Sequence, residues 1–157
     1  MPARQQPSPQ DPSDPSFRFE ESLFYWLVRV VHRYGLRMDE VLKRIGMDLP
    51  KWRVLMILTE LPSASVSELA EHSVLRLSTM TKVVQRLEQD GLVKTGQSPR
   101  DARVTEVFLT ERGVEAVASV RGQASRIYRQ AIEGVDGDER TILVDLLRRV
   151  SGNLDGR

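Results

Sequence analysis

A strand-loop-strand pattern inside an otherwise helical sequence is the feature that most constrains the fold of this chain. Residues 91–113 read GLVKTGQSPRDARVTEVFLTERG. Two runs of β-branched and apolar residues, 92–95 and 104–109, flank a loop that contains Gly96 and Pro99. Such runs, separated by turn-forming residues, are typical of a β-hairpin. Because the rest of the chain has helical spacing, the sequence predicts a mainly α protein with one small β-hairpin.

The residues before the hairpin predict two helices joined by a turn. Ser67, with glutamates in the following turn, favours a short helix that runs to about His72. A longer helix is predicted from about Leu77 until Asp90-Gly91, and its apolar residues have the i, i+3, i+4, i+7 spacing of a buried face: Met80, Val83, Val84 and Leu87. Helix, turn, helix and hairpin in this order are typical of a winged helix-turn-helix, whose second helix enters the major groove of DNA.

The face of this second helix that points away from the predicted core has the chemistry of a DNA-reading surface. Between Arg76 and Arg86 there are three basic residues and no acidic residue. Ser, Thr and Gln exchange hydrogen bonds with base edges, whereas Lys and Arg reach guanine or phosphates. An ordinary solvent-exposed face is the alternative, and the lack of carboxylates disfavours it. The predicted DNA-binding residues of this helix are Arg76, Ser78, Thr79, Thr81, Lys82, Gln85 and Arg86.

The hairpin tip adds a second group of predicted DNA-binding residues. Arg100 and Arg103 lie where the wing of a winged helix meets the DNA backbone or the minor groove, whose narrow form attracts arginine. Asp101 would repel phosphates, so we expect it to anchor an arginine and shape the turn. A solvated turn with incidental charges is the alternative interpretation.

Apolar residues at both ends of the chain predict a homodimer. Residues 20–34 and 114–150 keep helical spacing but carry more apolar surface than the winged domain could cover. Uncovered patches of this kind are rare on monomers. We therefore expect dimerisation helices in residues 17–47, loosened at Gly35, and in residues 114–157. A monomeric domain with a helical appendage is the alternative interpretation.

The remaining segments complete the predicted domain organisation. Residues 48–113 form the winged helix-turn-helix, in which Asp48 is expected to cap a helix and Thr110 another. Residues 1–16 contain five prolines and few apolar groups, and we expect a disordered tail there. Residues 17–157 are thus predicted to be a single domain.

At these residues the chain resembles the MarR-type transcriptional regulators. The resemblance is carried by MDLPKWRVLMIL, SVSELAEHSVLRLSTMTKVVQRLEQDGLV and SPRDARVTEVFLTERG. It implies an obligate homodimer whose first and last helices interleave, a recognition helix at about residues 77–90, and binding to a palindromic double-stranded DNA operator, most often as a repressor. It also implies a ligand pocket between the dimerisation helices and the DNA-binding part.

Two departures from the family pattern concern the DNA-binding surface. The family often has Ser or Thr just before the recognition helix, where this chain has Arg76-Leu77. The middle residue of the wing triplet, often basic in the family, is Ala102. The first departure puts the helix start in doubt, and the second weakens the expected hold of the wing on the DNA backbone.

Polar and aromatic residues near the junction of the first two helices are the candidate effector-binding residues. An arginine beside a tryptophan suits a small aromatic carboxylate, held by a forked ion pair and by stacking. Core tryptophans, surface ion pairs and structural histidines are the alternative interpretations. The segment EHSVLRLSTMTKVVQRLEQDGLV resembles family members that regulate nicotinate degradation, which implies a nicotinate-type effector. The candidates are Trp26, His32, Arg33, Tyr34, Trp52, Arg53 and His72.

Composition excludes several other classes of protein. The net charge of +1 by itself predicts neither a nucleic-acid binder nor an enzyme for acidic substrates. The chain has no cysteine, and this absence excludes a disulfide framework, a thiolate nucleophile and a cysteine-type zinc site. Two histidines 40 residues apart, with no glycine-rich phosphate loop, provide no catalytic constellation, so we expect no enzyme, no cofactor and no metal. No run is apolar enough for a membrane helix or a secretory signal, so the expected location is the cytoplasm. A winged-helix protein-interaction module is the remaining alternative.

Overall fold

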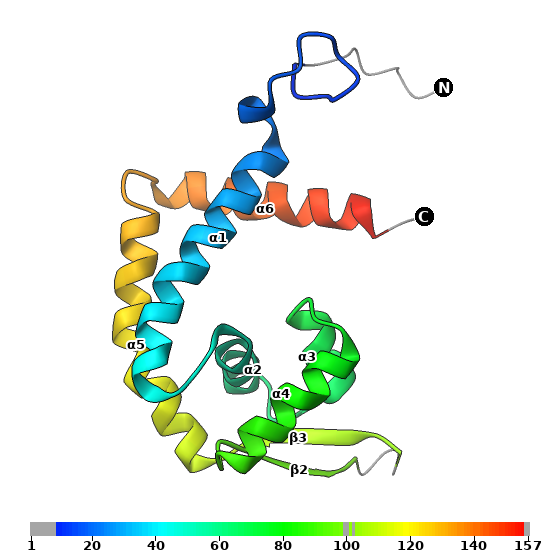
Figure 1. Cartoon of the computed structure of the whole chain (residues 1–157), viewed down its shortest axis with the longest axis vertical. Helices are drawn as coiled ribbons and strands as arrows, with labels where there is room; N and C mark the ends of the chain where they lie inside the picture. Colours follow the sequence, from blue (N-terminus) through cyan, green and yellow to red (C-terminus); the bar gives the residue numbers. More distant parts are fainter. Residues whose placement is uncertain (1–8, 99–100, 102, 156–157) are drawn as a thin grey trace.

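The computed structural model describes residues 9–98, 101 and 103–155 (Figure 1). Residues 1–8, half of the predicted tail, lie outside the described residues, and residues 9–16 form consecutive turns. In chain order the elements are the 3₁₀ turn Phe19–Glu21, α1 (Leu23–Leu42), the 3₁₀ turn Lys43–Ile45, α2 (Leu49–Glu60), β1 (Ala64–Ser65), α3 (Val66–His72), α4 (Leu77–Gln89), β2 (Val93–Gln97), β3 (Thr105–Leu109), α5 (Glu111–Ala131) and α6 (Gly137–Leu154).

Helix α5 connects the two parts of the molecule (Figure 1). It packs on α1 and on α2, while α2, α3, α4 and the sheet contact one another and form the winged helix-turn-helix. Helix α6 extends from the far end of α5, and none of its residues is buried. This arrangement confirms the prediction of a mainly α fold with a hairpin wing and helices on both sides. Within the described ranges, no helix is long and apolar enough to cross a membrane.

Two of the predicted helix caps are confirmed. The Asp48 carboxylate accepts a hydrogen bond from the backbone N–H of Lys51 at 2.9 Å and begins α2. The Thr110 hydroxyl accepts one from the backbone N–H of Gly113 at 3.1 Å and begins α5. Each cap satisfies a backbone donor that the first turn of a helix leaves free.

The predicted start of α3 at Ser67 is wrong by two residues. Ser65 is the N-cap: its hydroxyl accepts from the backbone N–H of Glu68, and the Glu68 carboxylate accepts from the backbone N–H of Ser65 at 2.7 Å. This reciprocal capping box needs Glu or Gln three residues after the cap. Ser67 is followed at that distance by Ala70, which has no side chain able to return the bond.

The wing is part of a sheet with the strand order β1-β3-β2. Strands β2 and β3 are antiparallel, with Val93 opposite Leu109 and Gln97 opposite Thr105. The two-residue strand β1 pairs with β3 on its other side, where Ala64 lies opposite Val107. Strand β1 was not predicted from the sequence, because two residues are too few to show a strand period. Its pairing ties the start of α3 to the middle of β3.

Helix α1 continues through Gly35, so the predicted loosening there is wrong. A Cβ atom at this glycine would lie 3.8 Å from a Leu49 methyl group, which is ordinary contact. Only the C-terminal part of the helix reaches the core, through Met38 and Leu42. The earlier turns leave large apolar side chains exposed: Leu23, Phe24, Trp26, Val28, Val30, Val31, Tyr34 and Leu36.

Gly113 allows the wing and α5 to approach each other closely. A Cβ atom at this position would lie 2.2 Å from the Leu92 carbonyl oxygen and 2.7 Å from a Leu109 methyl carbon. The same Leu92 carbonyl accepts hydrogen bonds from the backbone N–H and the hydroxyl of Thr110. The backbone is thus fixed by these bonds, and no larger residue fits without moving it.

We therefore expect Gly113→Ala to lower the free energy of unfolding by roughly 1–3 kcal/mol, the cost of overpacking a buried site. Chemical denaturation followed by circular dichroism measures this change. Gly122→Ala is the matched control, because a Cβ at Gly122 meets nothing within 4 Å. The control should keep or slightly raise the stability through its better helix propensity. Equal unfolding midpoints for the two variants would contradict the close approach.

Candidate nucleic-acid interface and ligand pocket

Helix α4 presents the face that the sequence predicted. Its apolar residues Met80, Val83, Val84 and Leu87 are buried, as expected from their spacing. All seven predicted DNA-binding residues at the start and along the outer face of α4 are exposed: Arg76, Ser78, Thr79, Thr81, Lys82, Gln85 and Arg86. The helix therefore offers a polar and basic surface without carboxylates over its first ten residues.

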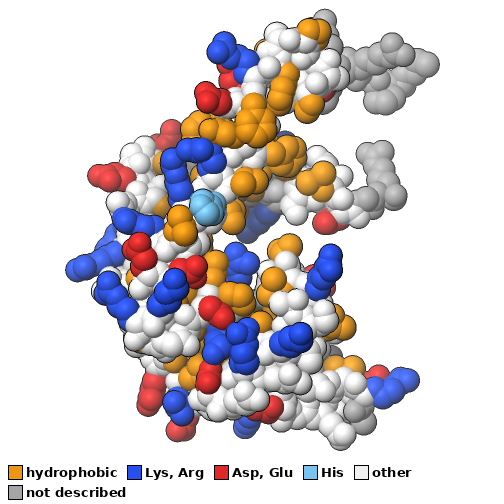
Figure 2. All heavy atoms as spheres, in the orientation of Figure 1, with side chains coloured by type: hydrophobic (Ala, Val, Ile, Leu, Met, Phe, Trp, Pro, Cys, Tyr) orange, Lys and Arg blue, Asp and Glu red, His pale blue; other side chains and the backbone are white. Residues whose placement is uncertain are grey.

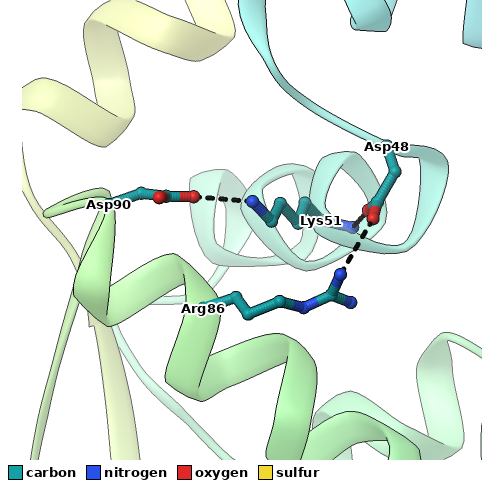
Figure 3. A network of polar contacts seen from close by, with 4 residues as sticks. All are labelled: Asp48, Lys51, Arg86 and Asp90. Carbon is teal, nitrogen blue, oxygen red and sulfur yellow. Dashed lines mark hydrogen bonds and ion pairs between the residues drawn. The ribbon is translucent and has the colours of Figure 1, made fainter.

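Two ion pairs hold the C-terminal half of α4 against the start of α2 (Figure 3). The Lys51 ammonium lies 2.6 Å from the Asp90 carboxylate, and the Lys51 side chain is only 10% exposed. The Arg86 guanidinium lies 3.5 Å from the carboxylate of Asp48. Arg86 was predicted to contact DNA, but in the structure its charge is paired within the protein.

The start of α4 has no side-chain cap. Arg76 occupies the N-cap position, and its side chain makes no capping hydrogen bond. The turn before it contains Val74, which adopts a left-handed conformation with φ 54° and is 88% exposed. This conformation is strained for a β-branched residue. The turn is closed by backbone bonds from Val74 to Glu71 and from Leu75 to Ala70.

The wing carries an arginine held by its neighbour. The Arg103 guanidinium forms a fork with both carboxylate oxygens of Asp101 at 3.2 Å, and the Arg103 backbone N–H donates to the same carboxylate. These bonds lower the pKa of the Asp101 carboxyl, with the side-chain bonds as the larger cause. The predicted anchoring role of Asp101 is thus confirmed. Arg100 lies outside the described residues.

A groove separates α4 from the wing. It has a volume of about 480 Å³, and its lining includes Leu77, Thr81, Gln85 and Arg103. At one end Glu88 accepts hydrogen bonds from the backbone and the hydroxyl of Thr95. These bonds join α4 directly to β2.

A second hollow, on the other side of α2, is the candidate ligand pocket. It has a volume of about 620 Å³ and lies between α1, α2, α3 and α5. Four of the predicted effector residues line it: Tyr34, Trp52, Arg53 and His72. Trp52 is also 5% exposed and part of the core, so it is both a pocket-lining residue and a core tryptophan.

The other three predicted effector residues are not brought to this pocket. Trp26, His32 and Arg33 are exposed on α1 and are absent from its lining. The Trp26 indole N–H instead donates to the Glu20 carbonyl at 2.7 Å, and its ring packs edge-on against Tyr25. Trp26 lies on the earlier turns of α1, about two turns before the pocket-lining Tyr34. His32 and Arg33 are next to Tyr34 in the chain, but consecutive residues of a helix point in different directions.

Helix α5 contributes pocket residues that were not predicted from the sequence. Arg121, Ser125 and Tyr128 line the hollow and follow the i, i+4, i+7 spacing of one helix face. Among the described residues, no carboxylate pairs with Arg121 or with Arg53. Arg53 instead donates to the Ser73 carbonyl, in the turn before α4, at 3.4 Å. The pocket thus combines two arginines with aromatic walls, which suits a small aromatic anion.

Comparison with known proteins agrees with this geometry. The model of the MarR family matches residues 47–105, which contain the helix-turn-helix and most of the wing. The HTH-type transcriptional repressor IacR of Pseudomonas putida is 40% identical over 154 residues, 98% of this chain and 92% of that repressor. The chain belongs to the MarR family. The predicted resemblance to the MarR-type regulators is therefore confirmed, and the chain is a DNA-binding transcriptional regulator and not an enzyme.

Solved structures of MarR-type proteins share the fold. Sco3205 of Streptomyces coelicolor, a MarR family regulator in complex with DNA, superposes with a TM-score of 0.76 at 24% identity, covering 84% of this chain and 88% of Sco3205. BpsR of Bordetella bronchiseptica, whose DNA binding is regulated by 6-hydroxynicotinic acid, superposes with a TM-score of 0.75 at 24% identity, covering 85% and 96%. At these identities the likeness shows the winged helix-turn-helix fold alone.

Proposed function

We propose that this MarR-family regulator is a homodimeric repressor of a palindromic operator, released by a small aromatic carboxylate. The observation that carries the proposal is the carboxylate-free face of α4, exposed beside the wing arginine. A DNA-binding protein of this kind acts in the cytoplasm. The protein-interaction alternative has no comparable support, because an α4 face with exposed Arg76 and Lys82 and no carboxylate suits a polyanion.

In this proposal the two DNA-binding elements have different tasks. Gln85 and its neighbours on α4 read base edges in the major groove, where side-chain amides pair with adenine. Arg103 enters the minor groove or contacts the backbone, together with Arg100, and Asp101 holds the arginine in place. Arg86 contributes by fixing α4 on α2 through Asp48. The remaining proposed contacts of α4 are Arg76, Ser78, Thr79, Thr81 and Lys82.

The homodimer follows from uncovered apolar surface on α1 and α6. Figure 2 shows hydrophobic side chains gathered over the upper part of the molecule, where these two helices lie. On α6 the exposed large apolar side chains are Ile142, Leu143, Val144, Leu146 and Leu154. Surface of this kind is typical of obligate dimers. A twofold axis then presents two copies of α4 to half-sites about 34 Å apart, one turn of DNA.

The effector is a small aromatic acid, and a pyridine carboxylate of the nicotinate type is our specific proposal. Arg121 and Arg53 supply guanidinium groups for a carboxylate, and Trp52 and Tyr128 supply aromatic surface. The volume of about 620 Å³ lies within the usual range for small-molecule sites. The structural neighbour BpsR, regulated by a hydroxylated pyridine carboxylate, supports this class of ligand.

Arg53 offers a route from the pocket to the DNA-binding surface. Its hydrogen bond to the Ser73 carbonyl reaches the turn that sets the start of α4. A carboxylate bound to Arg53 competes with that bond. The ligand then favours the arrangement of the turn in which Arg53 is not bonded to Ser73. The shift between the two arrangements is only as large as the difference in ligand affinity between them.

For the dimer, we expect sedimentation equilibrium to give a mass near twice the chain mass of 17.9 kDa. Val28→Glu, at a 69% exposed position on α1, should shift the protein toward the single-chain mass, because a charge buried without a partner is costly. Val74→Glu makes the same change at an 88% exposed position outside the predicted dimerisation helices and should leave the mass unchanged. A wild-type protein at the single-chain mass would overturn the homodimer.

For DNA binding, we expect Arg103→Ala to weaken binding to all duplexes and to reduce the salt slope by about one for each phosphate that the arginine neutralises. Gln85→Ala should instead narrow the difference between operator and random DNA by about 1–3 kcal/mol per half-site. Fluorescence anisotropy with DNA upstream of the protein's own gene and with a scrambled duplex, at two salt concentrations, measures both effects. Equal effects of the two substitutions on every duplex would show that the roles are wrongly assigned.

For the effector, we expect a nicotinate-type or a salicylate-type acid to release the operator in the same anisotropy assay. Arg121→Gln should raise the acid concentration required by about tenfold or more, since it removes a charge-assisted hydrogen bond. Each variant is compared with its own binding in the absence of acid. Arg126→Gln, an exposed arginine of α5 outside the pocket lining, is the control and should respond as wild type. An identical response of all three proteins would place the ligand elsewhere.

A further inference from the structure

Leu77 is an apolar residue at the exposed start of the recognition helix. It is 55% exposed, while the other apolar residues of α4 are buried. Leu77, Thr81 and Gln85 follow one another at i, i+4 and i+8, and all three line the groove between α4 and the wing. The leucine therefore belongs to the surface that faces DNA and not to the core.

The surroundings of Leu77 indicate what covers it. Ser78 and Lys82 are exposed on the same helix, and Arg103 lines the opposite wall of the groove. A partner for this surface must complement cations and hydroxyl groups and also supply a small apolar group. Duplex DNA meets both requirements, because its phosphates are anionic and thymine displays a C5-methyl group in the major groove.

The position along the helix agrees with this partner. In helix-turn-helix proteins the N-terminal residues of the recognition helix contact base edges. Leu77 is the first residue of α4, and the preceding Arg76 side chain makes no capping bond at that end. Thr81 and Gln85 follow at intervals of about 6 Å along the helix axis, so the three side chains meet successive positions of the half-site.

We propose that Leu77 is a specificity-determining residue that recognises thymine through van der Waals contact with its C5-methyl group. The inference rests on the proposed DNA-binding function and adds the chemistry of one base to it. Each operator half-site then contains a thymine whose methyl group is required, at the position that the start of α4 contacts. Gln85 specifies a neighbouring base through its amide, and Thr81 does so as an acceptor, since its hydroxyl donates to the Leu77 carbonyl at 3.0 Å.

Deoxyuridine tests the proposal because it lacks only the methyl group and keeps every hydrogen-bonding atom of thymine. The full-length protein is titrated with operator duplexes in which each thymine is replaced in turn by deoxyuridine. At one position per half-site, wild-type affinity should fall about fourfold, the effect of one buried methyl group. Leu77→Ala should bind the unmodified operator more weakly and lose the difference between thymine and deoxyuridine at that position.

Two further variants separate base recognition from general damage. Leu77→Met keeps an apolar side chain and should retain a preference for thymine, and Leu61→Ala, at an exposed leucine outside the groove, should behave as wild type. Thermal unfolding of each variant shows whether it is folded.

The failures of the two proposals are distinguishable. If the wild-type protein binds the operator but is insensitive to deoxyuridine at every position, or if Leu77→Ala keeps the full preference, this inference is overturned and the proposed function stands. If no duplex is preferred over scrambled DNA, both are overturned.

Discussion

The pair of charged contacts between α2 and α4 is the constraint on which the DNA-binding surface depends. Lys51 is almost fully buried, so its ammonium group must keep a partner, and Asp90 at the end of α4 is that partner. Asp48 both caps α2 and pairs with Arg86, one turn before Asp90. The two contacts support the rotation of α4 about its axis that the burial of its apolar face sets. That rotation places Met80 and Leu87 in the core and leaves the polar residues outside.

Helix α2 has a second role, because its other side forms a wall of the ligand pocket. Trp52 and Arg53 follow directly after Lys51, so one short segment touches both the recognition helix and the pocket. The wing is joined to α4 through Glu88 and Thr95. Polar contacts thus join the C-terminal half of α4 both to α2 and to the wing, so in the proposed function a ligand that moves α2 also acts on α4. Shape changes of this kind reach distant sites because packed elements shift as units.

Much of this architecture was predictable from local patterns, and the rest depended on contacts between distant residues. The spacing of Met80, Val83, Val84 and Leu87 correctly predicted both faces of α4, and Asp48 and Thr110 were recognisable caps because a cap is a local feature. Ser65 was missed in favour of Ser67 although Glu68 was visible in the sequence. The pairing of Arg86 with Asp48 and the entry of Arg121 into the pocket could not be predicted, since both join segments far apart in the chain. For the same reason, the sequence did not show that Trp26, His32 and Arg33 lie outside the pocket.

The uncovered apolar faces of α1 and α6 also have a consequence for the synthesis of the protein. Helix α1 leaves the ribosome before the helix-turn-helix and α6 leaves it afterwards, so their exposed side chains emerge at different times. The α1 face stays uncovered while more than a hundred further residues are added. Exposed apolar surface on a growing chain promotes aggregation. The helix-turn-helix between them can fold before α6 is synthesised. The order of synthesis therefore lets the DNA-binding part fold before the apolar faces of both α1 and α6 are present.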